Sequence, residues 1–219
     1  MISICTPTRN RPEEFKKFSQ SVWETVSDAN NVEISIYRDT DDDSIYEYSG
    51  NYILTIGKRM FPDALYNECH KAATGPIYVF CPDDMLFLSH GWDKMMMDAF
   101  DKSKDKIIFA YLNDDYARSN YCIVGGVHKN WVDTVGYFFN PAICRGGDVI
   151  INRIAKKLDR RAYLRNAHIK DTKIITDKTH TEYLDLIKKN SGHLWNSEDI
   201  VKEKERALAS LQNFIDTYQ

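Results

Sequence analysis

Residues 78–87 read YVFCPDDMLF, an apolar run that ends on two adjacent carboxylates, Asp83 and Asp84. Like charges side by side repel each other, so a fold keeps such a pair at the end of a buried strand most readily when a cation neutralises it. Hard divalent ions prefer carboxylate oxygens. The stretch therefore predicts a strand that ends at a metal site, although Pro-Asp-Asp is also good chemistry for a solvated turn.

A second acidic cluster favours the metal interpretation. It follows another β-like run, residues 32–37, and consists of Asp39, Asp41, Asp42 and Asp43. Two predicted strands thus end in acid. In open α/β sheets ligands bind beyond the carboxyl ends of the strands, because the connecting loops and helix N-termini converge there. We expect the functional site at that edge.

Length and composition describe a globular protein. The 219 residues are 43% hydrophobic and 12% aromatic, enough for one full domain or one domain with a C-terminal extension. The net charge of −3 argues against a wholly basic nucleic-acid coat. Composition alone implies no electrostatic partner, and the oligomeric state stays open.

The sequence predicts a cytoplasmic protein with no membrane span. Residues 1–9 lack the apolar core of a signal peptide, and no apolar run reaches transmembrane length. The five cysteines are scattered without a CxxC pair, which indicates reduced core thiols. A catalytic cysteine is the less common alternative.

Hydrophobic spacing predicts an α/β fold, a sheet flanked by helices. The predicted strands are 2–6, 32–37, 52–56, 77–81 and 106–111, and the predicted helices are 12–26, 62–73, 91–101, 148–158 and 197–218. Residues 112–147 have no clean period and are predicted to face a substrate. Residues 162–164 are predicted to be extended and to precede a polar loop that contains His168, Asp177 and His180.

The order of motifs resembles that of the nucleotide-sugar glycosyltransferases of the GT-A fold, especially the large inverting family with a Rossmann-like nucleotide-binding half. The matching stretches, which span residues 1–170, are residues 2–12, the acidic end of the second strand, Arg59 with residues 64–67, Asp83-Asp84 followed by Gly91-Trp92, and Gly147-Asp148. The resemblance implies a GT-A-like mixed sheet. Together with the pattern along the chain, it suggests a nucleotide-sugar-binding half (1–111), an acceptor-side half of the same domain (112–196) and a C-terminal amphipathic helix (197–219).

The resemblance also implies roles for single residues. Thr6, Pro7 and Arg9 would line the nucleotide pocket, Asp39 would accept a hydrogen bond from the base, and Arg59 would lie near the base or the pyrophosphate. Asp84, with Asp83 beside it, would hold Mn²⁺ or Mg²⁺ against the diphosphate of the donor. The family's usual acidic triplet is reduced here, because Pro82 replaces its first carboxylate.

Two later residues complete the implied site. Asp148 lies where such enzymes carry the general base that deprotonates the acceptor hydroxyl, although the same position suits a plain helix cap. His168 resembles the late histidine that completes the metal shell in some relatives, although a single histidine in a loop is more often a surface residue. Both roles are implied by the resemblance alone.

A run of basic residues adds a second candidate for the molecule that accepts the sugar. Residues 156–165, followed by His168 and Lys170, form the most basic stretch of the chain. Such a run is usually a solvated helix face. It could also contact a phosphate backbone, since clustered Lys and Arg gain affinity by releasing counterions. A hydroxymethylated DNA base is therefore an acceptor candidate beside the default glycan.

The resulting prediction is a metal-dependent glycosyltransferase that moves a sugar from a nucleoside-diphosphate sugar to an acceptor hydroxyl, with inversion. One alternative is a nucleotidyltransferase, which would release pyrophosphate, but the glycine-rich phosphate loop expected of it is absent from the N-terminal region. Another is a non-catalytic module that binds sugar nucleotides without turnover. The sequence does not identify the sugar or the nucleotide.

Overall fold

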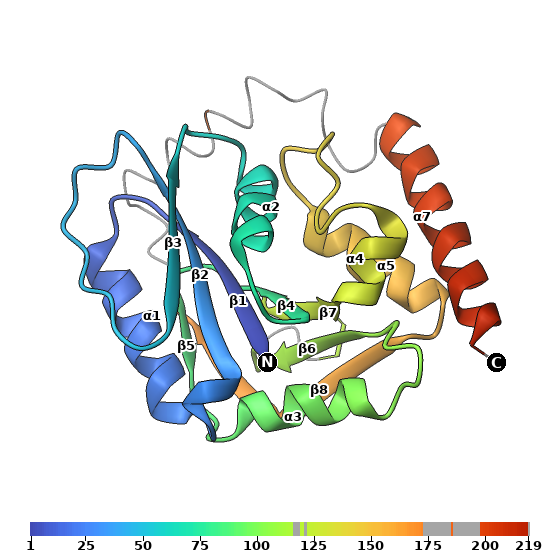
Figure 1. Cartoon of the computed structure of the whole chain (residues 1–219), viewed down its shortest axis with the longest axis horizontal. Coiled ribbons are helices and arrows are strands. Elements are labelled where there is room, and N and C mark those ends of the chain that lie inside the picture. Colours follow the sequence, from blue (N-terminus) through green and yellow to red (C-terminus); the bar gives the residue numbers. More distant parts are fainter. Residues whose placement is uncertain (116–118, 121, 173–184, 186–197, 219) are drawn as a thin grey trace.

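The computed structural model describes residues 1–115, 119–120, 122–172, 185 and 198–218. Over these residues the chain forms one mixed sheet with helices on both faces, as Figure 1 shows. This confirms the predicted α/β class. The predicted boundary between residues 111 and 112 falls inside one strand of this sheet, so both proposed halves share it.

The sheet combines a parallel half with a mixed half. Its strands are β1 (Ile2–Thr8), β2 (Val32–Asp39), β3 (Tyr52–Gly57), β4 (Ile77–Phe80), β5 (Met85–Phe87), β6 (Phe109–Asn113), β7 (Gly125–His128) and β8 (Arg161–Asp171). Their order is β3-β2-β1-β4-β7-β6-β8-β5. The first four are parallel, β7 is antiparallel to both its neighbours, β8 is parallel to β6, and β5 is antiparallel to β8. The parallel half is the Rossmann-like arrangement that was predicted.

Helices cover both faces of the sheet. They are α1 (Pro12–Thr25), the 3₁₀ turn η1 (Ala29–Asn31), α2 (Pro62–Ala72), α3 (Trp92–Asp101), α4 (Lys129–Val135), α5 (Gly147–Lys157) and α7 (Glu198–Thr217). Buried side chains of α1 and α3 pack in one core, and those of α2, α4, α5 and α7 pack in a second core on the opposite face. Figure 1 shows α7 lying against α4 and α5.

The alternation of side chains in β1 separates the two cores. Ile2 and Ile4 are fully buried toward α1 and α3, whereas Cys5 is buried with α2, because successive strand residues point to opposite faces. In α1, Phe15, Phe18 and Val22 recur at helical spacing on the buried side. The periodicity that predicted these elements is thus the pattern of burial itself.

Every predicted strand and helix is present, with ends shifted by up to three residues, but short elements were missed. β5, β7 and α4 were not predicted: β5 is only three residues long, and β7 begins with two glycines. A Cβ on Gly126 would lie 2.6 Å from the carbonyl oxygen of Tyr78, so the close approach of β4 excludes a side chain there. Residues 112–147 therefore contain more regular structure than their sequence suggests.

The predicted polar loop is wrong at His168, which lies within strand β8. Asp177 and His180 lie outside the described residues. The strand runs on because Ala167 and Ile169, on one side of it, are buried while β5 pairs with its end. The exposed residues Arg165 and Asn166 interrupt its hydrophobic pattern and hide it in the sequence.

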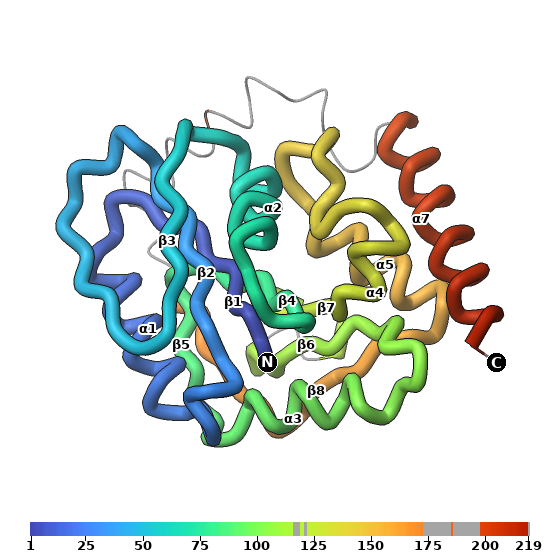
Figure 2. The backbone as a smooth tube through the Cα atoms, viewed as in Figure 1, coloured from blue at the N-terminus to red at the C-terminus, as the bar shows by residue number. Residues whose placement is uncertain are grey.

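The carboxyl ends of β1, β2 and β4 meet at one edge of the sheet. The connection after β2, residues 40–51, runs beside the loop between β1 and α1, as Figure 2 shows, and Asn10 hydrogen-bonds Asp42 across them. Within the described residues, no helix combines the length and apolarity needed to span a bilayer.

Candidate functional site

A cavity of about 400 Å³ opens at this edge of the sheet. Its wall is made by the ends of β1, β2 and β4, by the first turns of α2 and α5, and by the end of β8. The charged residues on the wall are Arg9, Arg11, Asp39, Arg59, Asp63, Asp83, Asp84, Arg145, Asp148 and Asp171. Apolar side chains, among them Tyr66, Phe80 and Phe139, complete it. The cavity thus combines guanidinium groups and carboxylates with an apolar wall.

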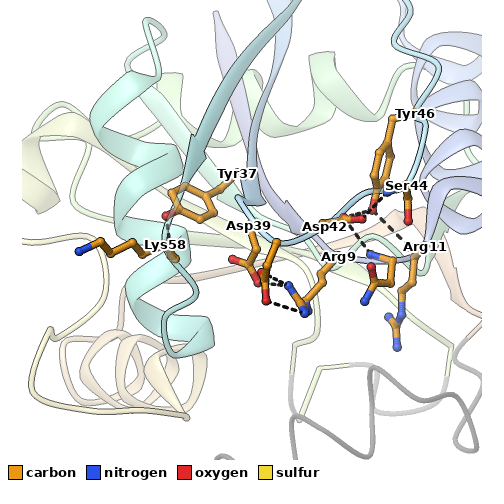
Figure 3. Close-up of polar contacts among 10 residues, drawn as sticks. Arg9, Arg11, Tyr37, Asp39, Asp42, Ser44, Tyr46 and Lys58 are labelled. Atoms are coloured by element: carbon orange, nitrogen blue, oxygen red, sulfur yellow. Dashed lines mark hydrogen bonds and ion pairs between the residues drawn. The ribbon is translucent and has the colours of Figure 1, made fainter.

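The loop between β1 and α1 sends two arginines in different directions. Asn10, between them, has a left-handed backbone with φ of 53°. Asp42 supports this turn, because its Oδ2 accepts hydrogen bonds from the Asn10 amide (2.9 Å) and from the Tyr46 hydroxyl (2.7 Å). The Tyr46 hydroxyl in turn accepts from the Arg11 amide at 3.2 Å. Figure 3 shows this network and the diverging side chains of Arg9 and Arg11.

Arg9 holds one oxygen of a buried carboxylate. Its Nη1 lies 3.1 Å from Asp39 Oδ2, and its guanidinium also pairs with exposed Asp41 (Figure 3). Asp39 Oδ1 is buried and accepts no hydrogen bond from the residues that the structure describes. Burial raises the pKa of Asp39, and the charge of Arg9 opposes that rise. A buried carboxylate oxygen on a cavity wall is suited to accept a hydrogen bond from the N–H group of a ligand.

Arg11 neutralises the acidic pair that ends β4. Its Nη1 lies 3.1 Å from Asp83 Oδ1 and 3.2 Å from Asp84 Oδ2. The Thr8 hydroxyl donates to Asp83 Oδ2 at 2.7 Å. Burial raises the pKa of Asp83 to about 6, with the charge of Asp84 adding to the rise and Arg11 opposing it. The cation expected from the sequence is supplied here by the chain.

The same carboxylates are chemically suited to a divalent ion. Within the described residues no group of three His, Cys, Asp or Glu side chains is arranged to hold a metal. However, Mg²⁺-type sites commonly use one or two carboxylates and complete their shell with substrate phosphates. Asp83 and Asp84 both line the cavity and offer hard oxygen ligands. The pair therefore fits an ion that arrives with a diphosphate, provided that Arg11 moves aside.

Two further carboxylates lie where α2 and α5 begin. Asp63 is in the first turn of α2 and is 4% exposed, and its Oδ2 accepts from the amide of Gly147 at 2.9 Å. Asp148 is in the first turn of α5, whose N-cap residue, Gly146, has no side chain. Burial, followed by the charge of Asp148, raises the pKa of Asp63 to about 8. The charge of Asp148 thus acts on a carboxyl group that is buried in the cavity wall.

Most of the residues that the sequence singled out line this cavity. They are Pro7, Arg9, Asp39, Arg59, Asp83, Asp84 and Asp148. Thr6 and His168 are not among the lining residues. Thr6 is fully buried in β1, on the opposite face of the strand from Pro7, and Thr8 lies on the wall instead. The Nδ1 of His168 lies 3.1 Å from the Asp115 carboxylate. The roles implied for these residues stay predictions.

Among the polar and charged lining residues, sequence reasoning left Thr8, Arg11, Asp63, Arg145 and Asp171 without a role. Thr8 and Arg11 belong to the N-terminal motif, and the positive charge of Arg11 is the one signal that could have paired this loop with Asp83 and Asp84. Asp63 follows Pro62 and reads as an ordinary acidic residue of a first helical turn. Its burial depends on the fold, so no local signal identifies it.

Two arginines of the basic run are paired within the fold. Arg160 pairs with buried Asp105 at 3.1 Å, and Arg161 lies over the Tyr111 ring and donates to Asn152. The basic side chains of the run and its continuation that remain exposed are those of Lys156, Lys157, Arg165 and Lys170. They do not line the cavity.

Comparison with known proteins gives a match in structure only. The sequence matches no protein-family model and no curated protein sequence. S. aureus TarS 1–349 in complex with UDP-GlcNAc matches with a TM-score of 0.66 at 12% identity, over 100% of this chain and 73% of that one. The mannosyltransferase PcManGT from Pyrobaculum calidifontis, in complex with GDP-Man and Mn²⁺, matches with a TM-score of 0.60 at 10% identity, over 97% and 73%.

GalNAc-T7 with UDP, GalNAc and Mn²⁺ matches with a TM-score of 0.66 at 8% identity, over 96% of this chain and 55% of that one. Identities this low show the fold alone. The chain has the fold of the GT-A nucleotide-sugar glycosyltransferases over its whole length, which confirms the fold that the motif order implied.

Proposed function

We propose that the chain is a glycosyltransferase that moves a sugar from a nucleoside-diphosphate sugar to an acceptor hydroxyl. The observation that carries this proposal is the buried Asp39 carboxylate on the cavity wall, with one oxygen held by Arg9 and the other buried without a donor from the described residues. A nucleobase N–H would satisfy that oxygen. The GT-A fold supports the proposal, because the matched structures include complexes with UDP-GlcNAc and with GDP-Man.

The surrounding wall suits the rest of a donor. Pro7, Arg9 and Arg59 would contact the nucleotide. Guanidinium groups bind phosphate oxygens in a bidentate manner, so Arg11 and Arg145 would face the diphosphate. Asp84, with Asp83, would hold Mn²⁺ or Mg²⁺, which supplies neutralisation of the charge that develops on the departing diphosphate.

Asp148 would act as the general base. Its carboxylate would take the proton of the acceptor hydroxyl while the hydroxyl oxygen forms a bond to the anomeric carbon. The bond from that carbon to the diphosphate oxygen breaks, and the nucleoside diphosphate leaves with the bonding electrons. One base opposite the leaving group is sufficient for this inverting displacement.

A glycan hydroxyl is the acceptor that we propose, with a hydroxymethylated DNA base as the second candidate. The DNA candidate rests on the basic run, and internal pairing of Arg160 and Arg161 leaves it fewer exposed cations than the sequence suggests. A screen of both acceptor classes separates them. DNA binding that weakens steeply with added salt would favour the second candidate. The cytoplasmic location stays a prediction from the sequence.

Product analysis tests the proposed reaction class. The chain is incubated with a panel of sugar nucleotides, and the released nucleotide and phosphate species are separated. Nucleoside diphosphate is the expected product. Pyrophosphate would indicate a nucleotidyltransferase instead. The pairing of Arg11 with both carboxylates favours, as a second candidate, a module that binds a nucleotide without turnover. That module would show nucleotide binding and no product with any donor or acceptor.

A further inference from the structure

Asp63 is a buried acid on the cavity wall to which the proposed reaction gives no role. It lies at the start of α2 and is bound to the start of α5 through the amide of Gly147, 2.9 Å from its Oδ2. The N-cap of α5, Gly146, provides no side-chain acceptor. A carboxyl group from another helix therefore satisfies an amide that the first turn of α5 leaves without a partner.

A second connection makes the placement of α5 relative to α2 rigid. Asn67, one helical turn after Asp63, accepts from the Phe139 amide at 2.9 Å and donates to the Phe139 carbonyl oxygen at 2.7 Å. The Phe139 ring in turn packs on Gly147, where an added Cβ would lie 2.5 Å from the ring. Two connections from α2, through Asp63 and through Asn67, thus reach the residue before Asp148.

The two acids differ in their surroundings. The charged and titratable groups that face Asp63 are Asp148, Arg145 and Cys144, and the backbone amides of Gly146 and Gly147 point to it. Burial and the charge of Asp148 favour the protonated form of Asp63, against the amides and Arg145.

We propose that Asp63 is a positioning residue for Asp148: it holds the first turn of α5 through the amide of Gly147 and so fixes the place of Asp148 on the cavity wall. This inference rests on the proposed function for the role of Asp148 as a base. The coupling between the two acids does not depend on turnover, so it is tested separately.

Thermal melting from pH 4 to pH 9 tests the pair without a substrate. The unfolded-state pKa of Asp is about 3.9, and that of folded Asp63 is about 8. The folded chain thus binds this proton more tightly, and stability falls as pH rises between these values. Wild type should lose stability relative to Asp63→Asn over this window. In an Asp148→Asn background the loss should be smaller, because the neighbouring charge is gone.

Two variants test the role of Asp63 as the hydrogen-bond acceptor of the Gly147 amide. Asp63→Asn keeps an oxygen for the Gly147 amide, whereas Asp63→Ala removes it. Asp63→Ala should melt about 2–8 °C below Asp63→Asn at pH 5. With a UDP-sugar panel at pH 7, Asp63→Asn should keep kcat within about threefold of wild type. Asp63→Ala should lose about 10-fold to 100-fold in kcat at unchanged donor KM, because the base is misplaced.

The proposal would be overturned if the difference in Tm between wild type and Asp63→Asn did not change with pH. Equal Tm values of Asp63→Asn and Asp63→Ala at pH 5 would also overturn it. An unchanged pH effect in the Asp148→Asn background would show that the two acids are not a pair. If wild type releases no nucleotide from any donor, the proposed function fails, and the melting curves still decide whether Asp63 and Asp148 are coupled.

Discussion

The Nη1 of Arg11 lies 3.1 Å from Oδ1 of Asp83, at the end of the strand whose acidic pair first indicated a metal site. It is also within 3.2 Å of Asp84. The guanidinium and a divalent ion would bind the same oxygens, so they compete for them. A donor diphosphate resolves this competition by offering Arg11 a second anionic partner.

Removal of Arg11 should strengthen metal binding in the absence of a nucleotide. Arg11→Gln takes away the competing cation and one positive charge near the ion, and we expect Mn²⁺ to bind about 10-fold more tightly. Titration with Mn²⁺, followed by its paramagnetic resonance signal, measures this. Arg165→Gln is the matched control, because Arg165 is exposed and outside the cavity wall. Equal or weaker Mn²⁺ binding by Arg11→Gln would show that Arg11 does not compete for the pair.

Asp39→Asn should weaken nucleoside-diphosphate binding by about 10-fold to 100-fold, the cost of losing a hydrogen bond to a charged acceptor. The neighbouring Asp41 provides a control, since it also pairs with Arg9 but is exposed. Asp41→Asn should change the dissociation constant by less than about threefold, because exposed ion pairs contribute little. Calorimetric titration with UDP and GDP gives both values. If Asp39→Asn and Asp41→Asn changed the dissociation constant equally, the nucleobase would not bind at Asp39.

Asp42 should matter for binding although it does not line the cavity. Asp42→Ala leaves the Asn10 amide and the Tyr46 hydroxyl without their acceptor, which costs about 1–3 kcal/mol of folding free energy. The left-handed turn at Asn10 then loses its support, and Arg9 and Arg11 lose their fixed directions. We expect a lower Tm and weaker UDP binding together. Tyr46→Phe removes the hydroxyl alone and should give a smaller loss of both. Full UDP affinity in Asp42→Ala would contradict this account of the loop.

Asp148→Asn should lower kcat by about 10²-fold to 10⁴-fold with little change in donor KM, because the loss of a general base affects the transition state and not donor binding. Asp159 is a suitable control: it follows α5, is exposed, and has a left-handed backbone that Asn tolerates. Steady-state assays with the donor that gives the fastest release measure both variants. A base role for Asp148 is excluded if Asp148→Asn and Asp159→Asn have equal kcat.

The sequence was sufficient for the main elements because burial follows a local period in them. A short apolar and β-branched run predicted β1, and the spacing of Phe15, Phe18 and Val22 predicted α1. The carboxyl-edge rule then brought Asp39 and Asp83 to one cavity, whereas Asp148 was expected there from the family resemblance. These contacts are non-local, yet topology alone implies them once the strands are known to be parallel.

What the sequence could not reveal depends on neighbours that are distant along the chain. Arg11 pairs with Asp83 and Asp84 because the loop turns at Asn10, and a hydrogen bond from the Asn10 amide to Asp42 stabilises that turn. Asp63 is buried only because α5 begins against α2. His168 was placed in a loop because exposed residues interrupt its strand, and pairing with β5 restores the strand.

The most direct test of the central claim is nucleoside-diphosphate release from a panel of sugar nucleotides, with Mn²⁺ or with EDTA, by wild type and Asp84→Asn. The account predicts release by wild type with Mn²⁺ from at least one donor, and its loss both in EDTA and in Asp84→Asn. Release that is equally fast in Asp84→Asn would contradict the assignment of the acidic pair. The absence of both release and nucleotide binding in wild type would contradict the assignment of the cavity as a sugar-nucleotide site.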